Sequence, residues 1–405
     1  MELQKSKQLK KKKERMNKRM NSKQFRTRTN YIAKENAGTE NAWGIGLDIG
    51  YSGVKGFVPN GVFCFPSYAK KITQTMFNAE PNENDIWLQD NTTGELWLVG
   101  ASAQNMISTA DSTDTEESLY GRNRYYDSMF KIISTAGLGL SMLSNQYGTP
   151  KGKEIYLQTG LPPKYWKEDS EYLKDVLSGT YDFKIRVGKN EWQELKFEIP
   201  EERIDVMYQP MGTLKSICVN NEGKLIKEAK EYMKKNILIF DVGFGTLDIF
   251  HLEGGALQPT QTLSDFGMKA ILSRTSDEIY KKHKTEIPVP AMQKVLEEGT
   301  IKVFSKKNMS ISTVTFDDIL EEKSREVFEE AMTKTKNIFN YFIDIDYLVV
   351  TGGTGAAWNN YILDHLKNMK TLSIVPGNKN AEDLPYLYAN ARGYYFRLLS
   401  QLNKK

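Results

Sequence analysis

The sequence is poor in the residues that build disulfide frameworks and metal centres. Among 405 residues there are two cysteines, Cys64 and Cys218, and they lie far apart in the chain. This usage argues against a disulfide framework and indicates a reducing, cytoplasmic environment. The three histidines have no metal-ligand spacing, which argues against a zinc centre.

Long apolar runs and the common phosphate-binding signatures are missing as well. No stretch approaches the roughly 20 apolar residues of a membrane-crossing helix, and the basic N-terminus has no apolar core behind it, so neither a membrane span nor a secretory signal is predicted. The Walker A pattern GxxxxGK[ST] does not occur, and no GxGxxG follows a predicted strand. These absences argue against a P-loop NTPase and against a dinucleotide-binding Rossmann domain.

The sequence does contain an uneven distribution of charge. Residues 1–41 carry 13 Lys and Arg against four Asp and Glu, whereas the whole chain is +4, so residues 42–405 are mildly acidic. A block of like charge with few large apolar residues predicts a disordered extension. Non-specific contact with DNA, RNA or an anionic membrane is one role for it, and a solvated leader without a specific role is the alternative. A later translation start, at Met16 or Met20, is a third.

Two glycine-containing turns with similar flanks lie about half the chain apart. They are GLDIGYSGVKGFV and IFDVGFGTLDIFHL, each with an apolar strand, an aspartate, a glycine two residues later and a second apolar strand. Asp48 and Gly50 of the first match Asp241 and Gly243 of the second. Asp-x-Gly alone is a common turn signal, but its repetition between strands predicts two similar domains that face each other across a cleft.

The combination of carboxylates and glycine turns indicates a particular class of ligand. Backbone N–H groups of a glycine turn bind an anion, whereas a carboxylate binds a cation, so a metal-bound nucleotide would satisfy both. A third glycine-rich loop, TGGTG at 351–355, follows the apolar strand YLVV. Its glycines would let the backbone approach a sugar or a flat ring closely, although alone it would be an ordinary turn between a strand and a helix.

In this order, the three loops resemble the phosphate-1, phosphate-2 and adenosine motifs of the superfamily of actin, sugar kinases and heat-shock chaperone ATPases. The resemblance covers nearly everything from Trp43 to the C-terminal helix, and the spacing of Lys55 after Asp48 is actin-like. The segments LQTGLPPKYW and VMYQPMGTL resemble bacterial plasmid-segregation actins of the ParM type. VMYQPMGTL falls where the family carries its first connecting helix, and ANARGYYF looks like the second.

The resemblance implies an α/β fold with two similar actin-like (ribonuclease-H-like) domains that face each other across a nucleotide cleft. It divides the chain into a basic extension at 1–41, domain I at 42–209 plus 383–405, and domain II at 210–382. Helices are expected over 267–284 and 316–342 from the sequence pattern.

The resemblance also implies ATP and Mg²⁺ as cofactors. Asp48 and Asp241 would hold the Mg²⁺, mostly through its waters, and Lys55 would neutralise phosphate charge. Gln209 would orient the attacking water, with Asp241 aiding proton acceptance; without the resemblance Gln209 would only be a strand-end hydrogen-bonder. Tyr51 replaces a small hydroxyl residue, so either Ser52 contributes the contact to the γ-phosphate or that contact is lost. The residues expected to bind the nucleotide are Gly50, Tyr51, Ser52, Gly53, Lys55, Gly243, Phe244, Gly245, Thr246, Gly352, Gly353 and Thr354.

Three functions are compatible with these motifs. The first is an ATPase that polymerises into filaments and segregates plasmid DNA through a DNA-binding adaptor protein, with filament contacts from 62–120 and 267–345. The second is a small-molecule (sugar-type) kinase, for which no catalytic base and sugar-binding loop stand out. The third is a chaperone-type ATPase, which would need a substrate-binding domain after the C-terminal helix.

Overall fold

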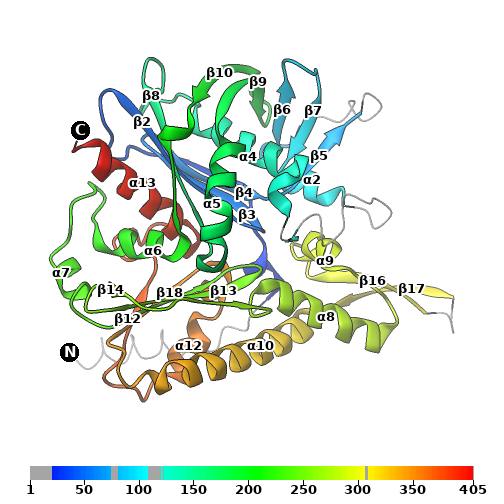
Figure 1. Cartoon of the computed structure of the whole chain (residues 1–405). Helices are drawn as coiled ribbons and strands as arrows, with labels where there is room; N and C mark the ends of the chain where they lie inside the picture. Colours follow the sequence, from blue (N-terminus) through cyan, green and yellow to red (C-terminus); the bar gives the residue numbers. More distant parts are fainter. Residues whose placement is uncertain (1–20, 74–80, 108–119, 122, 306–308, 405) are drawn as a thin grey trace, which may run out of the picture.

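The computed structural model of the chain describes residues 21–73, 81–107, 120–121, 123–305 and 309–404. Two six-stranded sheets lie in separate halves of the molecule, and two helices pass between the halves (Figure 1). The expected α/β fold of two similar halves is therefore confirmed.

The sheet of the first half has the strand order β1-β4-β3-β2-β8-β11. Strands β2, β3 and β4 form an antiparallel meander, and β8 and β11 continue the sheet in parallel with β2. Strand β2 is buried along nearly its whole length because the sheet is covered on both faces. The strands are β1 (Asn30–Ala33), β2 (Ala42–Ile49), β3 (Gly53–Val58), β4 (Gly61–Pro66), β8 (Glu154–Leu161) and β11 (Ile204–Tyr208).

The sheet of the second half repeats this plan with the order β14-β13-β12-β18-β19, and β15 also pairs with β13. An antiparallel hairpin, β12–β13, is again followed by two parallel strands, β18 and β19. The repeat of sequence is thus a repeat of topology. The strands are β12 (Ile237–Val242), β13 (Thr246–Glu253), β14 (Ala256–Leu257), β15 (Gln261–Ser264), β18 (Tyr347–Thr351) and β19 (Ser373–Pro376).

Each half also carries a smaller accessory sheet. The first half has a five-stranded sheet of order β10-β9-β6-β7-β5, and the second has the two-stranded hairpin β16–β17, which projects from the molecule (Figure 1). These strands are β5 (Ala69–Ile72), β6 (Ile86–Asp90), β7 (Leu96–Val99), β9 (Gly179–Val187), β10 (Gln193–Ile199), β16 (Thr300–Ser305) and β17 (Ser310–Thr315).

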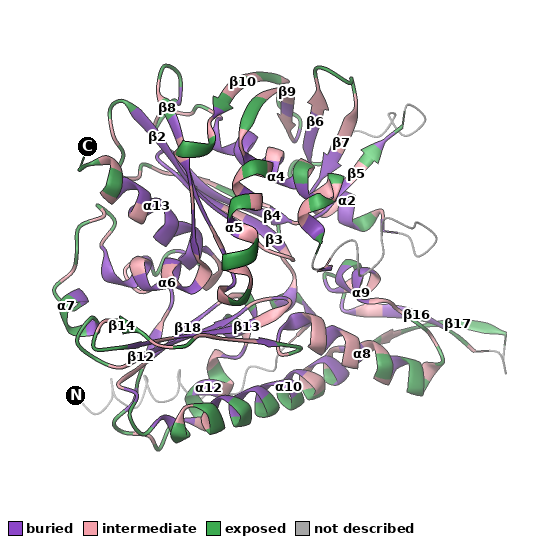
Figure 2. Cartoon of the chain, viewed as in Figure 1, coloured by how far each residue is buried: buried purple, intermediate pink, exposed green. Residues whose placement is uncertain are grey.

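Helices cover the faces of the two large sheets. Along α10 the buried side chains recur every three or four residues, so one face packs inward and the opposite face is exposed (Figure 2). The helices are α2 (Ala101–Asn105), α4 (Ser128–Ser141), α5 (Pro163–Leu177), α6 (Gln209–Cys218), α7 (Ala229–Tyr232), α8 (Met268–His283), α9 (Val289–Val295), α10 (Asp317–Ile338), α11 (Gly353–Ala357), α12 (Asn359–His365) and α13 (Ala389–Leu402). Short 3₁₀ turns are η1 (Ser22–Phe25), η4 (Arg124–Tyr126), η5 (Glu201–Arg203), η6 (Asn340–Phe342) and η7 (Tyr386–Tyr388).

Helices α6 and α13 cross in close contact between the two halves. A Cβ atom on Gly393 would lie 1.7 Å from the carbonyl oxygen of Gly212, so only glycine permits this approach. Both helices were expected as connecting helices, and each begins at the edge of the cleft. The crossing therefore fixes where their first residues lie relative to the two hairpins.

Most predicted elements are present, with one correction at the N-terminus. The helices expected over 267–284 and 316–342 correspond to α8 and α10. Residues 1–20 of the expected extension lie outside the described residues, but 21–41 are not a disordered tail: β1 pairs with β4, and Phe25 is buried in the core of the second half. The charge pattern predicted disorder because the segment is rich in cations, whereas one aromatic side chain, Phe25, is enough to anchor it to the core. The predicted domain limits remain predictions.

Within the described part of the chain, every helix is too short or too polar to span a lipid bilayer.

Candidate nucleotide site

The first hairpin holds an acidic and a basic side chain side by side. Asp48 on β2 and Lys55 on β3 are cross-strand partners, and the Lys55 Nζ atom lies 3.2 Å from Oδ2 of Asp48. Both side chains are largely buried. The turn closes through a hydrogen bond from the Gly50 amide to the Gly53 carbonyl, and a Cβ atom on Gly50 would lie only 2.8 Å from Nζ of Lys55. Glycine at position 50 therefore leaves room for the ammonium group over the turn.

The second hairpin pairs two carboxylates in the same register. Asp241 on β12 lies opposite Asp248 on β13, and both are buried. Burial raises the pKa of Asp241 to about 7, with the charges of Asp248 and Asp48 adding to the shift, while the hydrogen bond from Asn390 opposes it. Burial likewise raises the pKa of Asp248 to about 6, although Thr262 and Thr246 donate hydrogen bonds to it. This hairpin therefore concentrates acidic groups.

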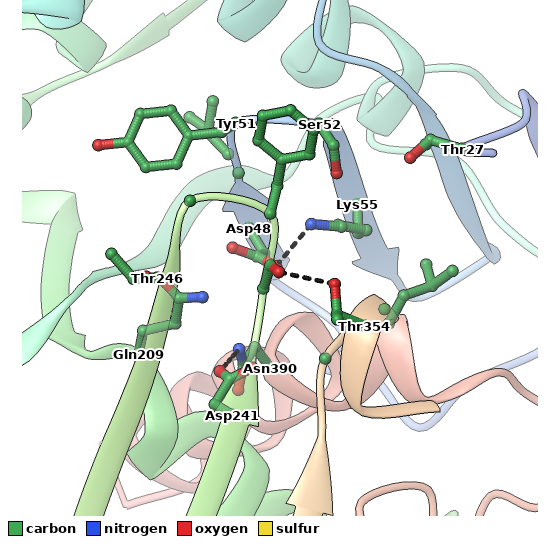
Figure 3. A pocket seen from close by; sticks show the side chains of 18 of the residues that line it. Thr27, Asp48, Tyr51, Ser52, Lys55, Gln209, Asp241, Thr246, Thr354 and Asn390 are labelled. Atoms are coloured by element: carbon green, nitrogen blue, oxygen red, sulfur yellow. Dashed lines mark hydrogen bonds and ion pairs between the residues drawn. The ribbon is translucent and has the colours of Figure 1, made fainter. Parts of the chain in front are cut away.

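The two turns face each other across one cavity. The ring of Tyr51, in the first turn, packs against the second turn so closely that a Cβ atom on Gly245 would lie 3.2 Å from its Cδ2. Phe244 belongs to the buried cluster of the second half, and its ring packs at a tilt against Tyr120, with the ring centres 4.8 Å apart. Figure 3 shows Asp48 and Asp241 entering the same space from opposite sides.

The third loop is tied directly to the second hairpin. Gly352 has a φ of +83°, and a Cβ atom there would collide with the carbonyl oxygen of Val242 at 2.2 Å. Thr354 donates a hydrogen bond from its hydroxyl to the carbonyl of Gly243 at 2.8 Å. A Cβ atom on Gly353 would meet nothing within 4 Å, so the loop has open space on its cleft side. These are the features that the close approach of a ligand requires.

The connecting helices bring further polar groups to the second hairpin. Gln209 is the first residue of α6 and lines the cavity (Figure 3). Asn390, in the first turn of α13, donates from Nδ2 to Oδ2 of Asp241 at 2.9 Å. Its Oδ1 atom accepts hydrogen bonds from the amide and the hydroxyl of Thr213 on α6. Asp241 is thus held by both connecting helices through one asparagine.

The cavity between the halves has a volume of about 260 Å³ and is lined by nearly all of the predicted site residues. Gly53 is the exception: it is not among the lining residues, and a Cβ atom there would lie 2.8 Å from the methyl carbon of Thr27. The predicted residues that line the cavity are Asp48, Gly50, Tyr51, Ser52, Lys55, Gln209, Asp241, Gly243, Phe244, Gly245, Thr246, Gly352, Gly353 and Thr354.

Sequence reasoning missed three contributions to this cavity. Arg124 is buried; its guanidinium lies 4.5 Å from the centre of the Tyr51 ring and donates to the carbonyl of Gly50 at 3.2 Å. Asn390 falls within a segment that was expected to be a connecting helix, but no pattern singled it out. Residues 24–27 line the cavity from the N-terminal segment, which was expected to be disordered. A conserved position would be the usual signal for such residues, and a single sequence does not carry it.

The donor set fits a hydrated divalent cation better than a dehydrated one. Asp48 and Asp241 are the predicted metal residues, and both line the cavity. Among the described residues, no group of three or more His, Cys, Asp or Glu side chains could enclose an ion. Two carboxylates suit Mg²⁺, which retains several of its waters and binds through one or two carboxylates together with substrate phosphates.

Comparisons with known proteins agree with the resemblance that the motifs carry. Residues 46–212 match the family described as actin like proteins, N terminal domain. The structure superimposes on a 15-stranded ParM filament from Clostridium botulinum with a TM-score of 0.66 and 19% identity, over 89% of this chain and 100% of that one. The match to the apo psk41 ParM protein has a TM-score of 0.60 and 18% identity, and it covers 90% of this chain and 99% of that one. The match to the Alp12 filament structure has a TM-score of 0.55 and 15% identity, and it covers 90% of this chain and 100% of that one. No curated protein matches the chain by sequence. At these identities the likeness establishes the fold, and it confirms the predicted resemblance.

Proposed function

We propose that this chain, whose residues 46–212 match the N-terminal domain of actin-like proteins and whose fold is that of ParM, binds Mg²⁺ and ATP in the cleft, hydrolyses the ATP and polymerises into filaments. One observation carries the proposal. Two buried aspartates, Asp48 and Asp241, line one cavity together with three glycine-rich turns, so groups for a cation and groups for an anion converge there. A metal-bound nucleotide matches that combination of charges.

Each residue has a distinct task in this proposal. Asp48 and Asp241 would hold the waters of Mg²⁺, which when bound would neutralise charge on the phosphate oxygens. Lys55 would neutralise charge on the β- and γ-phosphates. Gln209 orients the attacking water, and Asp241, whose pKa is about 7, accepts its proton. Catalysis then consists mostly of positioning and electrostatic stabilisation.

Sedimentation of the purified protein with and without ATP tests the filament proposal. We expect pelleting with Mg²⁺ and ATP or a non-hydrolysable analogue, and release into the supernatant as ATP is consumed. The protein with EDTA in place of Mg²⁺ is the control. A protein that hydrolyses ATP but stays monomeric at high concentration with the analogue would be a kinase or a chaperone-type ATPase instead.

Plasmid segregation in the cytoplasm is the finer part of the proposal. It rests on the ParM-like fold and on two cysteines that are buried and unpaired. A DNA-binding adaptor protein would supply DNA specificity. Residues 1–20 carry nine Lys and Arg against two Glu, which suits weak, salt-sensitive contact with DNA. Deleting residues 1–20 should reduce DNA binding at low salt and leave ATP hydrolysis unchanged; an unchanged affinity for DNA would exclude that role.

A further inference from the structure

A segment that precedes the family-matched region crosses from one half of the molecule to the other. We call residues 22–27 the strap. Strand β1 follows it and is paired in antiparallel register with β4, so the C-terminal end of the strap is attached to the first half. The family match begins at residue 46, so the strap lies outside the matched residues.

The other end of the strap is anchored in the second half. The Ser22 amide donates to Oδ1 of Asp317 at 2.9 Å, at the start of α10. Phe25 is only 2% exposed and belongs to the same buried cluster as Phe244 and Met268. Removing a phenyl ring from such a cluster exposes apolar surface to water. The strap is therefore held at this end by packing as well as by a hydrogen bond.

The middle of the strap lies between α2 of the first half and α9 of the second. The Arg26 guanidinium donates to the Gln104 side chain on α2 and, at 3.2 Å, to the backbone carbonyl of Gln293 on α9. Gln104 in turn donates to the side chain of Gln293 at 3.2 Å. Helices α2 and α9 lie on the side of the molecule away from α6 and α13 (Figure 1). Arg26 thus joins the two halves on the side where the connecting helices do not.

The strap also forms part of the cavity wall. Residues 24–27 line the cavity, and the methyl group of Thr27 packs against Gly53 in the first hairpin turn. Figure 3 shows Thr27 on the same side of the cavity as Lys55. A molecule held between the two hairpins would lie next to these residues.

We propose that the strap closes the nucleotide cleft and forms one wall of the nucleotide site, so that nucleotide leaves only when the strap releases one of the two halves. The proposal rests on the function proposed above. Two halves joined only by α6 and α13 can open on the far side as a hinge does. The strap opposes that motion. Opening would break the hydrogen bond from Arg26 to Gln104 if the strap stayed with the second half. If the strap stayed with the first half, opening would break the bond to Gln293 and expose Phe25.

Dissociation of a fluorescent ATP analogue, chased with excess ATP in the presence of Mg²⁺, measures release directly. Deleting residues 1–27 should accelerate dissociation at least about tenfold, and Arg26→Gln by a few-fold, because charged hydrogen bonds are lost. Two controls match these variants. Deleting residues 1–20 leaves the strap intact, and Arg203→Gln removes a cation that pairs with Glu154 inside the first half, away from the strap. Both should dissociate within about twofold of the wild-type rate.

A second measurement separates the strap from nucleotide binding itself. Hydrogen exchange of the nucleotide-free protein should be faster in α2 and α9 after Arg26→Gln than after Arg203→Gln. Equal exchange in these two variants together with equal dissociation rates would overturn the proposal. If no protein binds the analogue while exchange still differs, the proposed ATP-binding function fails and the strap remains a closure of the cleft.

Discussion

The two hairpins have the same backbone arrangement but differ in the charges of their side chains. Asp48 and Asp241 occupy equivalent positions, one residue before the end of a buried strand, and each is followed two residues later by a glycine. Across the ladder, however, Asp48 faces Lys55, whereas Asp241 faces Asp248. The first hairpin is therefore internally neutralised, and the second accumulates negative charge.

This difference shows that the two halves share a topology without sharing the charges at equivalent positions. A cross-strand partner on the same face of a hairpin lies close enough to change the pKa of a carboxylate. The ammonium of Lys55 compensates Asp48 within its own hairpin. Burial raises the pKa of the Asp241 carboxyl to about 7, and neither the hydrogen bond from Asn390 nor the charge of Lys55 offsets that rise. The second hairpin is the stronger attractor for a cation.

Removing the second carboxylate tests this asymmetry most severely. Asp241→Ala should lower the rate of phosphate release about a hundred- to a thousandfold, since it removes a preorganised electrostatic group. Its circular dichroism should match that of the wild type. Asp205→Ala, which removes a surface carboxylate paired with Arg397, is the control. Wild-type hydrolysis by a folded Asp241→Ala protein would contradict the mechanism.

Breaking the ion pair of the first hairpin should lower the stability of the nucleotide-free protein. Lys55→Met leaves the buried Asp48 carboxylate without its partner, which should lower the free energy of unfolding by about 3 kcal/mol. The double variant Asp48→Asn/Lys55→Met should recover most of that loss, because no charge is left unpaired. Urea unfolding of the nucleotide-free proteins measures both. A single variant as stable as the wild type would mean that the pair contributes nothing.

Neutralising the partner carboxylate in the second hairpin should have the opposite sign. The pKa of Asp248 is raised to about 6 in the folded protein, so the folded state retains a proton that the unfolded chain loses at lower pH. Stability is thus lost as pH rises through this window, and the loss is complete above pH 6. Asp248→Asn should therefore stabilise the protein by about 2 kcal/mol at pH 7.5, and by much less near pH 4. Unfolding at both values checks this; a gain independent of pH would refute it.

The smallest effect expected is on the pH dependence of Mg²⁺-dependent nucleotide binding. With a pKa of about 7, Asp241 is increasingly protonated below pH 7 and must lose a proton to act with a cation. Affinity for ATP in the presence of Mg²⁺ should fall about fivefold between pH 7 and pH 6. Asp241→Asn should flatten this dependence, and EDTA should remove it. A steep dependence that persists in Asp241→Asn would assign it to another group.

The hairpins themselves were predictable because their signals are local. An apolar run, an aspartate and a glycine within a few residues determine where a strand ends and turns. Asp48 and Lys55 lie in one hairpin, so their pairing follows from its register. The helices α8 and α10 were likewise expected from the spacing of apolar residues.

The N-terminal segment was predicted wrongly for a physical reason. Its 13 cations give it the composition of a solvated chain, and a single phenylalanine does not change the prediction of disorder that follows from that composition. In the structure, Phe25 packs into a core cluster formed mostly by residues more than 200 positions later, and β1 pairs with β4 at the edge of the first sheet. Such order depends on a surface that the rest of the chain supplies.

The sequence by itself determined the family of folds, the three glycine-rich turns and the two aspartates, because these depend on neighbours along the chain. Only the tertiary structure decided which side chains complete the site. Asn390 reaches Asp241 across 149 residues of sequence, and Arg124 reaches the Gly50 turn from a segment with no recognisable motif. Burial, which raises the pKa of Asp241, likewise arises only when the two halves close around it. Contacts between distant residues carry no periodicity, and so a single sequence does not display them.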